Sequence, residues 1–154
     1  MEKDNQRDSY PGVTSYQIAE IGLTEDHFDE TRPYYETLFG QMPMYGKEGI
    51  GKSGIKGFEF TSNIWVFGVI HKRGYLDMKL RALAILAGLT VGQRLDVARI
   101  WINACLNVGC TEEEVKELII FTSLFGGHPA MRDVALAFDE VVAKRKADPS
   151  LKMA

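Results

Sequence analysis

The sequence predicts an all-α protein, for three reasons. Between residues 77 and 143, apolar residues recur every three or four positions, the spacing of an α-helix. Residues of the types that begin and end helices separate these apolar stretches. The rest of the chain also offers no partner for a β-strand, which would be needed to form a sheet. With 154 residues, 45% of them hydrophobic, the chain is long enough for one domain with a buried core.

The first 57 residues have a different character from the rest. Residues 1–23 are predicted to form a polar extended arm, and a helix is predicted to start after Thr24. Pro33 either kinks this helix or begins a second one, which ends at Gly40. Five glycines make residues 41–57 a loop. The aromatic and β-branched segment from Phe58 to Ile70 is predicted to be a buried helix.

Two helices are predicted between residues 77 and 108. Asp77 is a candidate N-cap for the first helix, which is expected to be central because it is apolar on most sides. The second helix is predicted from Leu95 to Val108, with Gly109 as its C′ residue. Leu80, Leu83, Ala84 and Ala87 recur at helical spacing on the first helix, and Ile85 and Leu86 widen the apolar face that is expected to be buried.

Two further helices follow. Thr111 and Glu114 have the spacing of a capping box, and the helix that they begin is expected to end at Gly126 and Gly127. Pro129 suits the first turn of the last helix. We therefore divide the chain into residues 1–57, a helical domain over residues 58–146, and a charged tail over residues 147–154. On the two helices that begin at Thr111 and Pro129, the residues expected to be buried are Val115, Leu118, Ile119, Thr122, Val134, Phe138 and Val141.

Composition excludes several classes of function. The net charge of -3 argues against a nucleic-acid partner. No apolar run approaches the roughly 18–20 residues that span a bilayer, and residues 1–10 do not resemble a signal peptide. Cys105 and Cys110 lack the C-x-x-C spacing, so we expect free thiols in a reducing compartment. These observations favour the cytoplasm.

Residues 46–53 (GKEGIGKS) match the P-loop pattern G-x-x-x-x-G-K-[ST]. A P-loop needs a buried strand before it and a helix after it, so that backbone N–H groups hold the phosphates. Residues 41–45 are a poor strand, and Gly54 and Gly57 oppose a helix. A mobile glycine-rich lid is the favoured interpretation, and a nucleotide-binding site is a third hypothesis for the function.

Three blocks resemble, in order, the motifs of one family. Residues 76–87 (LDMKLRALAILA) resemble the helix LD-x-K-x-R-E-L-x-x-L-A, and residues 105–115 (CLNVGCTEEEV) resemble the turn A-L-N-x-G-x-T-x-E-E-I. Residues 124–131 (LFGGHPAM) resemble V-Y-x-G-x-P-A-A. On these motifs the chain resembles the carboxymuconolactone decarboxylase family of the alkylhydroperoxidase D-like superfamily. The stretch before Phe58 is not matched.

This resemblance implies an all-α, alkylhydroperoxidase D-like helical bundle that assembles as a trimer or hexamer. It also implies a site whose acid/base residues are a glutamate where this chain has Ala82 and a histidine where it has Trp101. A methyl group cannot carry a proton, and an indole N–H can only donate. The C-x-x-C pair of the peroxidases is missing as well. We therefore expect neither decarboxylation of carboxymuconolactone nor reduction of peroxides.

Two histidines are the candidate catalytic residues. His128 precedes Pro129 at the start of a helix, where the helix dipole favours a neutral imidazole that can act as a base. His71 stands beside Lys72 and Arg73, which could hold an anionic substrate. For each histidine the alternative is a structural or solvated role. We favour His128 narrowly. Candidate substrate-binding residues are Arg81, Trp101, Trp65 and Arg73.

The lead hypothesis is a small-molecule lyase, isomerase or cyclase that uses histidine acid/base chemistry. Its substrate would be hydrophobic and anionic or enolisable, for example an aromatic or polyketide-like compound of secondary metabolism. Neither a cofactor nor a metal is expected, since the three histidines are scattered without ligand spacing. The alternative is a non-catalytic member that binds a ligand or partner.

Overall fold

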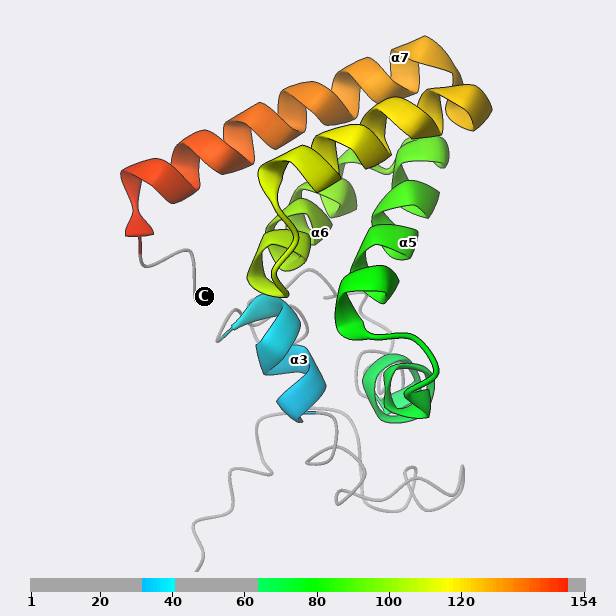
Figure 1. Cartoon of the computed structure of the whole chain (residues 1–154), viewed down its shortest axis with the longest axis vertical. Helices are drawn as coiled ribbons and strands as arrows, with labels where there is room; N and C mark the ends of the chain where they lie inside the picture. Colours follow the sequence, from blue (N-terminus) through cyan, green and yellow to red (C-terminus); the bar gives the residue numbers. More distant parts are fainter. Residues whose placement is uncertain (1–31, 41–63, 150–154) are drawn as a thin grey trace, which may run out of the picture. The chain divides into compact units, whose positions relative to one another are not determined.

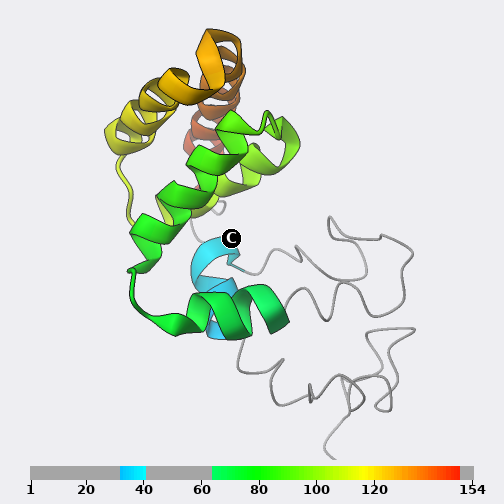
Figure 2. The same cartoon turned by 90° about the vertical axis from the view of Figure 1, so that its right-hand side faces the viewer.

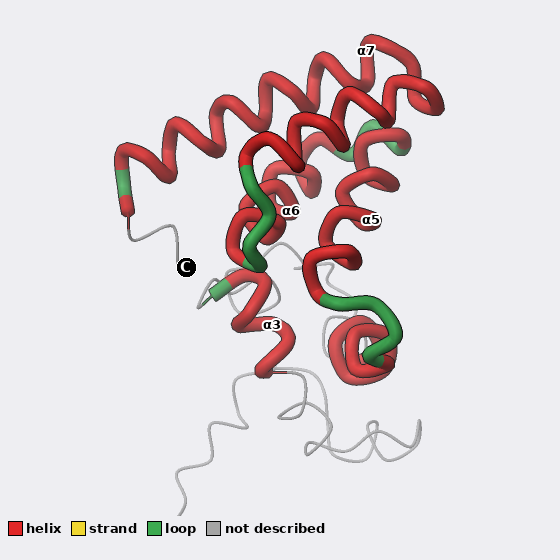
Figure 3. Tube along the Cα trace, in the orientation of Figure 1, coloured by secondary structure: helices red, strands yellow, loops and turns green. Residues whose placement is uncertain are grey.

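A computed structural model describes residues 32–40 and 64–149 of the chain, and every regular element in these ranges is helical. The predicted all-α class is therefore confirmed for the described residues (Figures 1 and 3). The expectations for residues 1–31, 41–63 and 150–154, including the P-loop-like segment, lie outside them. The elements are α3 (Arg32–Phe39), η2 (Ile64–Ile70), η3 (His71–Arg73), α5 (Met78–Val91), α6 (Leu95–Asn107) and α7 (Glu112–Ala147).

The chain divides into two compact units. The first consists of residues 1–36 and 41–73 and contains η2 and η3. The second consists of residues 37–40 and 74–154 and contains α5, α6 and α7. As predicted, α3 ends before Gly40, whose φ of 63° is easily adopted by glycine. Among the described residues, no helix is both long enough and apolar enough to cross a membrane.

Helix α7 is a helical hairpin. Gly127 has φ 77° and ψ 166°, and there the chain reverses direction (Figures 1 and 2). We call residues 112–126 the first arm and residues 128–147 the second arm. The arms run antiparallel, since Lys146 near the end of the second forms an ion pair of 3.3 Å with Glu112 at the start of the first. The predicted helix end at Gly126 and Gly127 is thus confirmed.

Helix α5 begins where the sequence predicts, because the Asp77 carboxylate accepts a hydrogen bond of 2.8 Å from the Leu80 N–H. The predicted buried face of this helix is wrong in part. Leu86 is buried as expected, but Leu80 is 52% exposed and Ala84 is exposed. Ala82 and Thr90, which were not predicted, are buried. Nearly every residue of α5 is apolar, so the periodicity does not single out one face. The buried Thr90 hydroxyl donates to the Leu86 carbonyl oxygen at 2.8 Å.

Helix α6 ends in a Schellman motif. Gly109, with φ 89°, is the C′ residue that the sequence predicts. The Cys110 N–H donates to the Cys105 carbonyl oxygen at 2.9 Å, and the Gly109 N–H donates to that of Leu106 at 3.4 Å. The chain then enters α7 directly, through the predicted capping box of Thr111 and Glu114.

The core of the second unit is formed by α5, α6 and both arms of α7. Most of the residues predicted to be buried on α7 are buried, but Leu118 is only half-buried and Val142 replaces Val141. The Lys116 ammonium lies 5.5 Å from the centre of the Phe138 ring, so the two arms also contact each other through a cation–π pair. Fully or nearly fully buried residues include Ala82, Leu86, Ala98, Ile102, Ala104, Val115, Ile119, Val134, Ala137 and Phe138.

The reversal of α7 requires a glycine at position 127. Gly127→Ala is expected to lower the free energy of unfolding by about 1–3 kcal/mol, because this φ and ψ combination is essentially restricted to glycine. A new Cβ would meet only the Cδ of Pro129, at an ordinary 3.8 Å, so the cost is backbone strain. The measurement is urea denaturation.

Gly88→Ala is the matched control. Gly88 lies inside α5 with nothing within 4 Å of a new Cβ, so alanine there should stabilise the protein by about 0.5–1 kcal/mol. Equal effects at the two positions would contradict a glycine-dependent reversal.

Candidate functional site

The two positions at which the resemblance places acid/base chemistry lie in the core. Ala82 on α5 is fully buried, and Trp101 on α6 is 6% exposed. The Trp101 ring meets Phe39 edge to face, with the ring centres 5.2 Å apart and the planes at 86°. Such aromatic pairs contribute about 0.5–1.5 kcal/mol beyond the burial of their area. Both positions therefore serve packing.

Asn107 joins three segments beside this aromatic pair. Its Nδ2 donates to the Leu38 carbonyl oxygen at 3.0 Å, and its Oδ1 accepts from the Arg145 guanidinium at 2.8 Å. Arg145 also donates to Oδ1 of Asn103. Burial lowers the pKa of Arg145 from its usual value. These contacts connect the end of α3 to α6 and to the second arm of α7.

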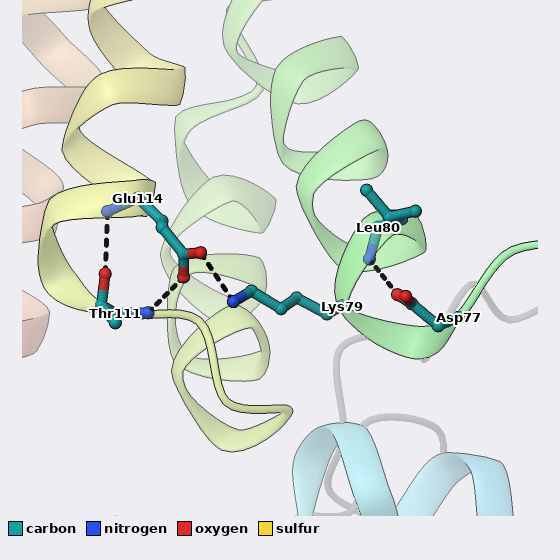
Figure 4. A network of polar contacts seen from close by, with 5 residues as sticks. All are labelled: Asp77, Lys79, Leu80, Thr111 and Glu114. Atoms are coloured by element: carbon teal, nitrogen blue, oxygen red, sulfur yellow. Dashed lines mark hydrogen bonds and ion pairs between the residues drawn. The ribbon is translucent and has the colours of Figure 1, made fainter.

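A second polar network holds the start of α7 near the start of α5 (Figure 4). Lys79 forms an ion pair of 2.7 Å with Glu114, whose carboxylate also accepts from the Thr111 N–H at 2.8 Å. The hydrogen bond from Lys79 holds the pKa of Glu114 below its usual value, and the same bond raises the pKa of Lys79. The network is exposed to solvent, so we assign it a structural role.

His128 lies at the tip of the α7 hairpin, directly after Gly127, and is exposed. Arg132, also exposed, stands four residues further along the second arm, which places the two side chains on one face of the helix. The first arm ends beside this tip with two strongly exposed apolar residues, Leu124 at 71% and Phe125 at 73%. Arg132 is not among the residues predicted from the sequence, although its spacing of four positions from His128 is a signal for a shared helix face.

The structure does not bring His128 and Arg81 together. Gly126, at the hairpin tip, lies against Val91 at the C-terminal end of α5, since a Cβ on Gly126 would come within 3.1 Å of the Val91 Cα. Arg81 is half-buried near the other end of α5. Val91 lies ten positions after Arg81, which is a rise of about 15 Å along the helix. A small substrate at the tip therefore does not reach Arg81.

The other predicted site residues belong to the first unit. His71 is 2% exposed and stacks on Phe67, with the ring centres 5.3 Å apart. Phe67 in turn meets Tyr35 edge to face at 5.6 Å. Trp65 is 58% exposed, and Arg73 is exposed. His71 is thus part of a buried aromatic cluster.

The match to a family model extends over residues 63–140, which include α5, α6 and most of α7. The chain belongs to the carboxymuconolactone decarboxylase family. The predicted resemblance is therefore confirmed. Among its relatives is a 4-carboxymuconolactone decarboxylase of Acinetobacter baylyi, which is 35% identical over 77 residues. That alignment covers 50% of this chain and 58% of the relative.

A charge placed at Ala82 tests whether this family position is core. Ala82→Glu is expected to lower the free energy of unfolding at neutral pH by at least about 2 kcal/mol, because it buries a carboxyl group. Burial would raise the pKa of this carboxyl above its unfolded value of about 4.3. The folded state then binds the proton more tightly, so the loss of stability grows as the pH rises above that value.

Ala84→Glu is the control, on the exposed side of the same helix, and should change the stability by no more than about 0.5 kcal/mol. Both variants are measured by urea denaturation at acidic and neutral pH. If Ala82→Glu is as stable as Ala84→Glu, position 82 is open to solvent or substrate and the assignment to the core fails.

Proposed function

We propose that this protein is a small-molecule lyase, isomerase or cyclase that uses His128 as its acid/base residue. The substrate would be hydrophobic and anionic or enolisable, of an aromatic or polyketide-like kind, and the reaction would need no cofactor. Membership of an enzyme family supports a catalytic role. The loss of the usual acid/base pair at Ala82 and Trp101 supports a reaction that differs from that of the decarboxylase relative.

The observation that carries the proposal is the set of side chains at the hairpin tip. His128 and Arg132 are exposed one turn apart on the second arm, and Leu124 and Phe125 are exposed at the end of the first arm. The imidazole of His128 would take a proton from an enolisable carbon and return it. Arg132 would bind the carboxylate or the developing enolate with a planar pair of N–H donors. Leu124 and Phe125 would hold the apolar part of the substrate.

The remaining predicted residues have weaker support. Arg81 could bind an anion, but it lies about 15 Å along α5 from the level of the tip. His71 is buried against Phe67, which favours a structural role over contact with substrate. Arg73 and Trp65 are exposed and could contact a ligand near η2. In this proposal, Arg132 takes the anion-binding role expected of Arg81.

A second candidate is a non-catalytic member of the family that binds a ligand or a partner. The burial of Ala82 and the packing of Trp101 on Phe39 favour it, because they replace proton-transfer groups with core. Both candidates predict that an aromatic acid binds and raises the melting temperature. Only turnover of the bound compound separates them.

We also propose that the protein is a homo-oligomer, a trimer or hexamer, of the cytoplasm. Ile120 and Phe121 are exposed apolar residues on the first arm, of the kind that marks interaction surfaces. The two free cysteines suit a reducing compartment. Light scattering at micromolar concentration should give a multiple of 17.3 kDa, and a monomer alone would contradict the assembly.

The test begins with a thermal-shift screen of aromatic and polyketide-like carboxylic acids, followed by turnover assays of the compounds that bind. His128→Gln is expected to lower kcat about 10²–10⁴-fold, the usual cost of losing a general base. Arg132→Gln should raise KM about tenfold or more, because a charged hydrogen bond to the substrate is lost. Lys144→Gln, which removes an exposed charge near the far end of the second arm, should change neither constant.

If His128→Gln stays folded and keeps normal turnover, His128 is not the acid/base residue. His71→Ala then tests the other histidine. If no binding compound is turned over at all, the non-catalytic candidate replaces the enzyme.

A further inference from the structure

The Schellman motif that ends α6 brings the two cysteines of the chain together. Cys105 lies in the last turn of α6, and Cys110 is the residue before the N-cap of α7. The Cys110 N–H bonds to the Cys105 carbonyl oxygen at 2.9 Å. A Cα atom lies about 2.4 Å from its own carbonyl oxygen and about 1.5 Å from its own nitrogen, so this bond keeps the two Cα atoms within about 6.8 Å. Disulfides join Cα atoms about 4.4–6.8 Å apart.

The side chains of this pair also meet. Both thiols are free, and they share a hydrogen bond. That bond lowers the pKa of Cys110 and raises the pKa of Cys105, so Cys110 gives up its proton more readily than Cys105. Burial of Cys110 acts in the opposite direction and raises its pKa, whereas the charge of Lys79 lowers it and those of Glu114 and Asp77 raise it. The hydrogen bond to Cys105 and the nearby ammonium of Lys79 both stabilise a thiolate at this position.

The two cysteines differ in access. Cys105 is fully buried within α6, whereas Cys110 is 6% exposed and stands between the exposed residues Gly109 and Thr111. A reagent that approaches the connecting turn therefore meets Cys110 first. Both cysteines are buried, but Cys110 is the less buried of the two, so we expect it to react first and Cys105 to react second.

We propose that Cys105 and Cys110 form a reversible redox modification site, a dithiol that a low-molecular-weight disulfide converts into an intramolecular disulfide. The Cys110 thiolate attacks one sulfur of the small disulfide, which releases one thiolate and leaves a mixed disulfide on Cys110. The Cys105 thiol then gives up its proton and attacks the Cys110 sulfur, which releases the second small thiol. The protein loses two electrons and two protons overall, and the small disulfide gains them.

The experiment treats the reduced full-length protein with oxidised glutathione, blocks the remaining thiols by alkylation, and identifies the products by peptide mass spectrometry. The wild type should give a peptide cross-linked between Cys105 and Cys110, with little glutathione adduct, at a rate independent of protein concentration. Cys105→Ser should accumulate the adduct on Cys110, because the second step is removed. Cys110→Ser should leave Cys105 unmodified while the protein is folded.

Circular dichroism shows whether the variants are folded, and the wild-type result does not depend on them. A stable mixed disulfide in the folded wild type, without a cross-link, would overturn the proposal. So would a cross-link that forms only after unfolding in denaturant, since the folded geometry would then prevent the reaction. A faster reaction at Cys105 in Cys110→Ser than at Cys110 in Cys105→Ser would overturn the assigned order.

Discussion

The side-chain amide of Asn107 is the contact on which the arrangement of the second unit depends. It donates to the Leu38 carbonyl oxygen and accepts from Arg145, so one residue of α6 connects segments near both ends of the described chain. The first bond holds the end of α3, which carries Phe39, against α6, which carries Trp101. The second bond fixes the returning arm of α7 against α6. An apolar residue at position 107 could make neither bond.

In this arrangement, the two positions at which the family carries its acid/base residues, 82 on α5 and 101 on α6, are part of the buried core. Trp101 packs on Phe39, and Ala82 is completely covered, so neither position offers a group that moves a proton. The hairpin of α7 provides the exposed alternative, since its reversal at Gly127 leaves His128 and Arg132 at the surface. The chain thus keeps the scaffold of the carboxymuconolactone decarboxylase family without acid/base groups at these two positions.

Features with a local physical cause could be predicted from the sequence. The cap at Asp77, the capping box at Thr111 and the helix ends at Gly109 and Gly127 each depend on a few neighbouring residues, and the structure contains them all. The buried face of α5 could not be predicted, because it depends on which other helices cover a helix that is apolar all round. For the same reason, the separation of Arg81 from the hairpin tip follows only from the packing.

We propose that the ligand contacts the hairpin tip and not the Trp101 position. Nitrogen-15 NMR tests it directly, because the chain has only three histidines and two tryptophans whose ring signals must be assigned. An aromatic carboxylic acid that raises the melting temperature is titrated into the labelled protein. The account predicts that the imidazole signals of His128 shift and that the indole N–H of Trp101 does not. A shift at Trp101 with His128 unchanged would contradict it.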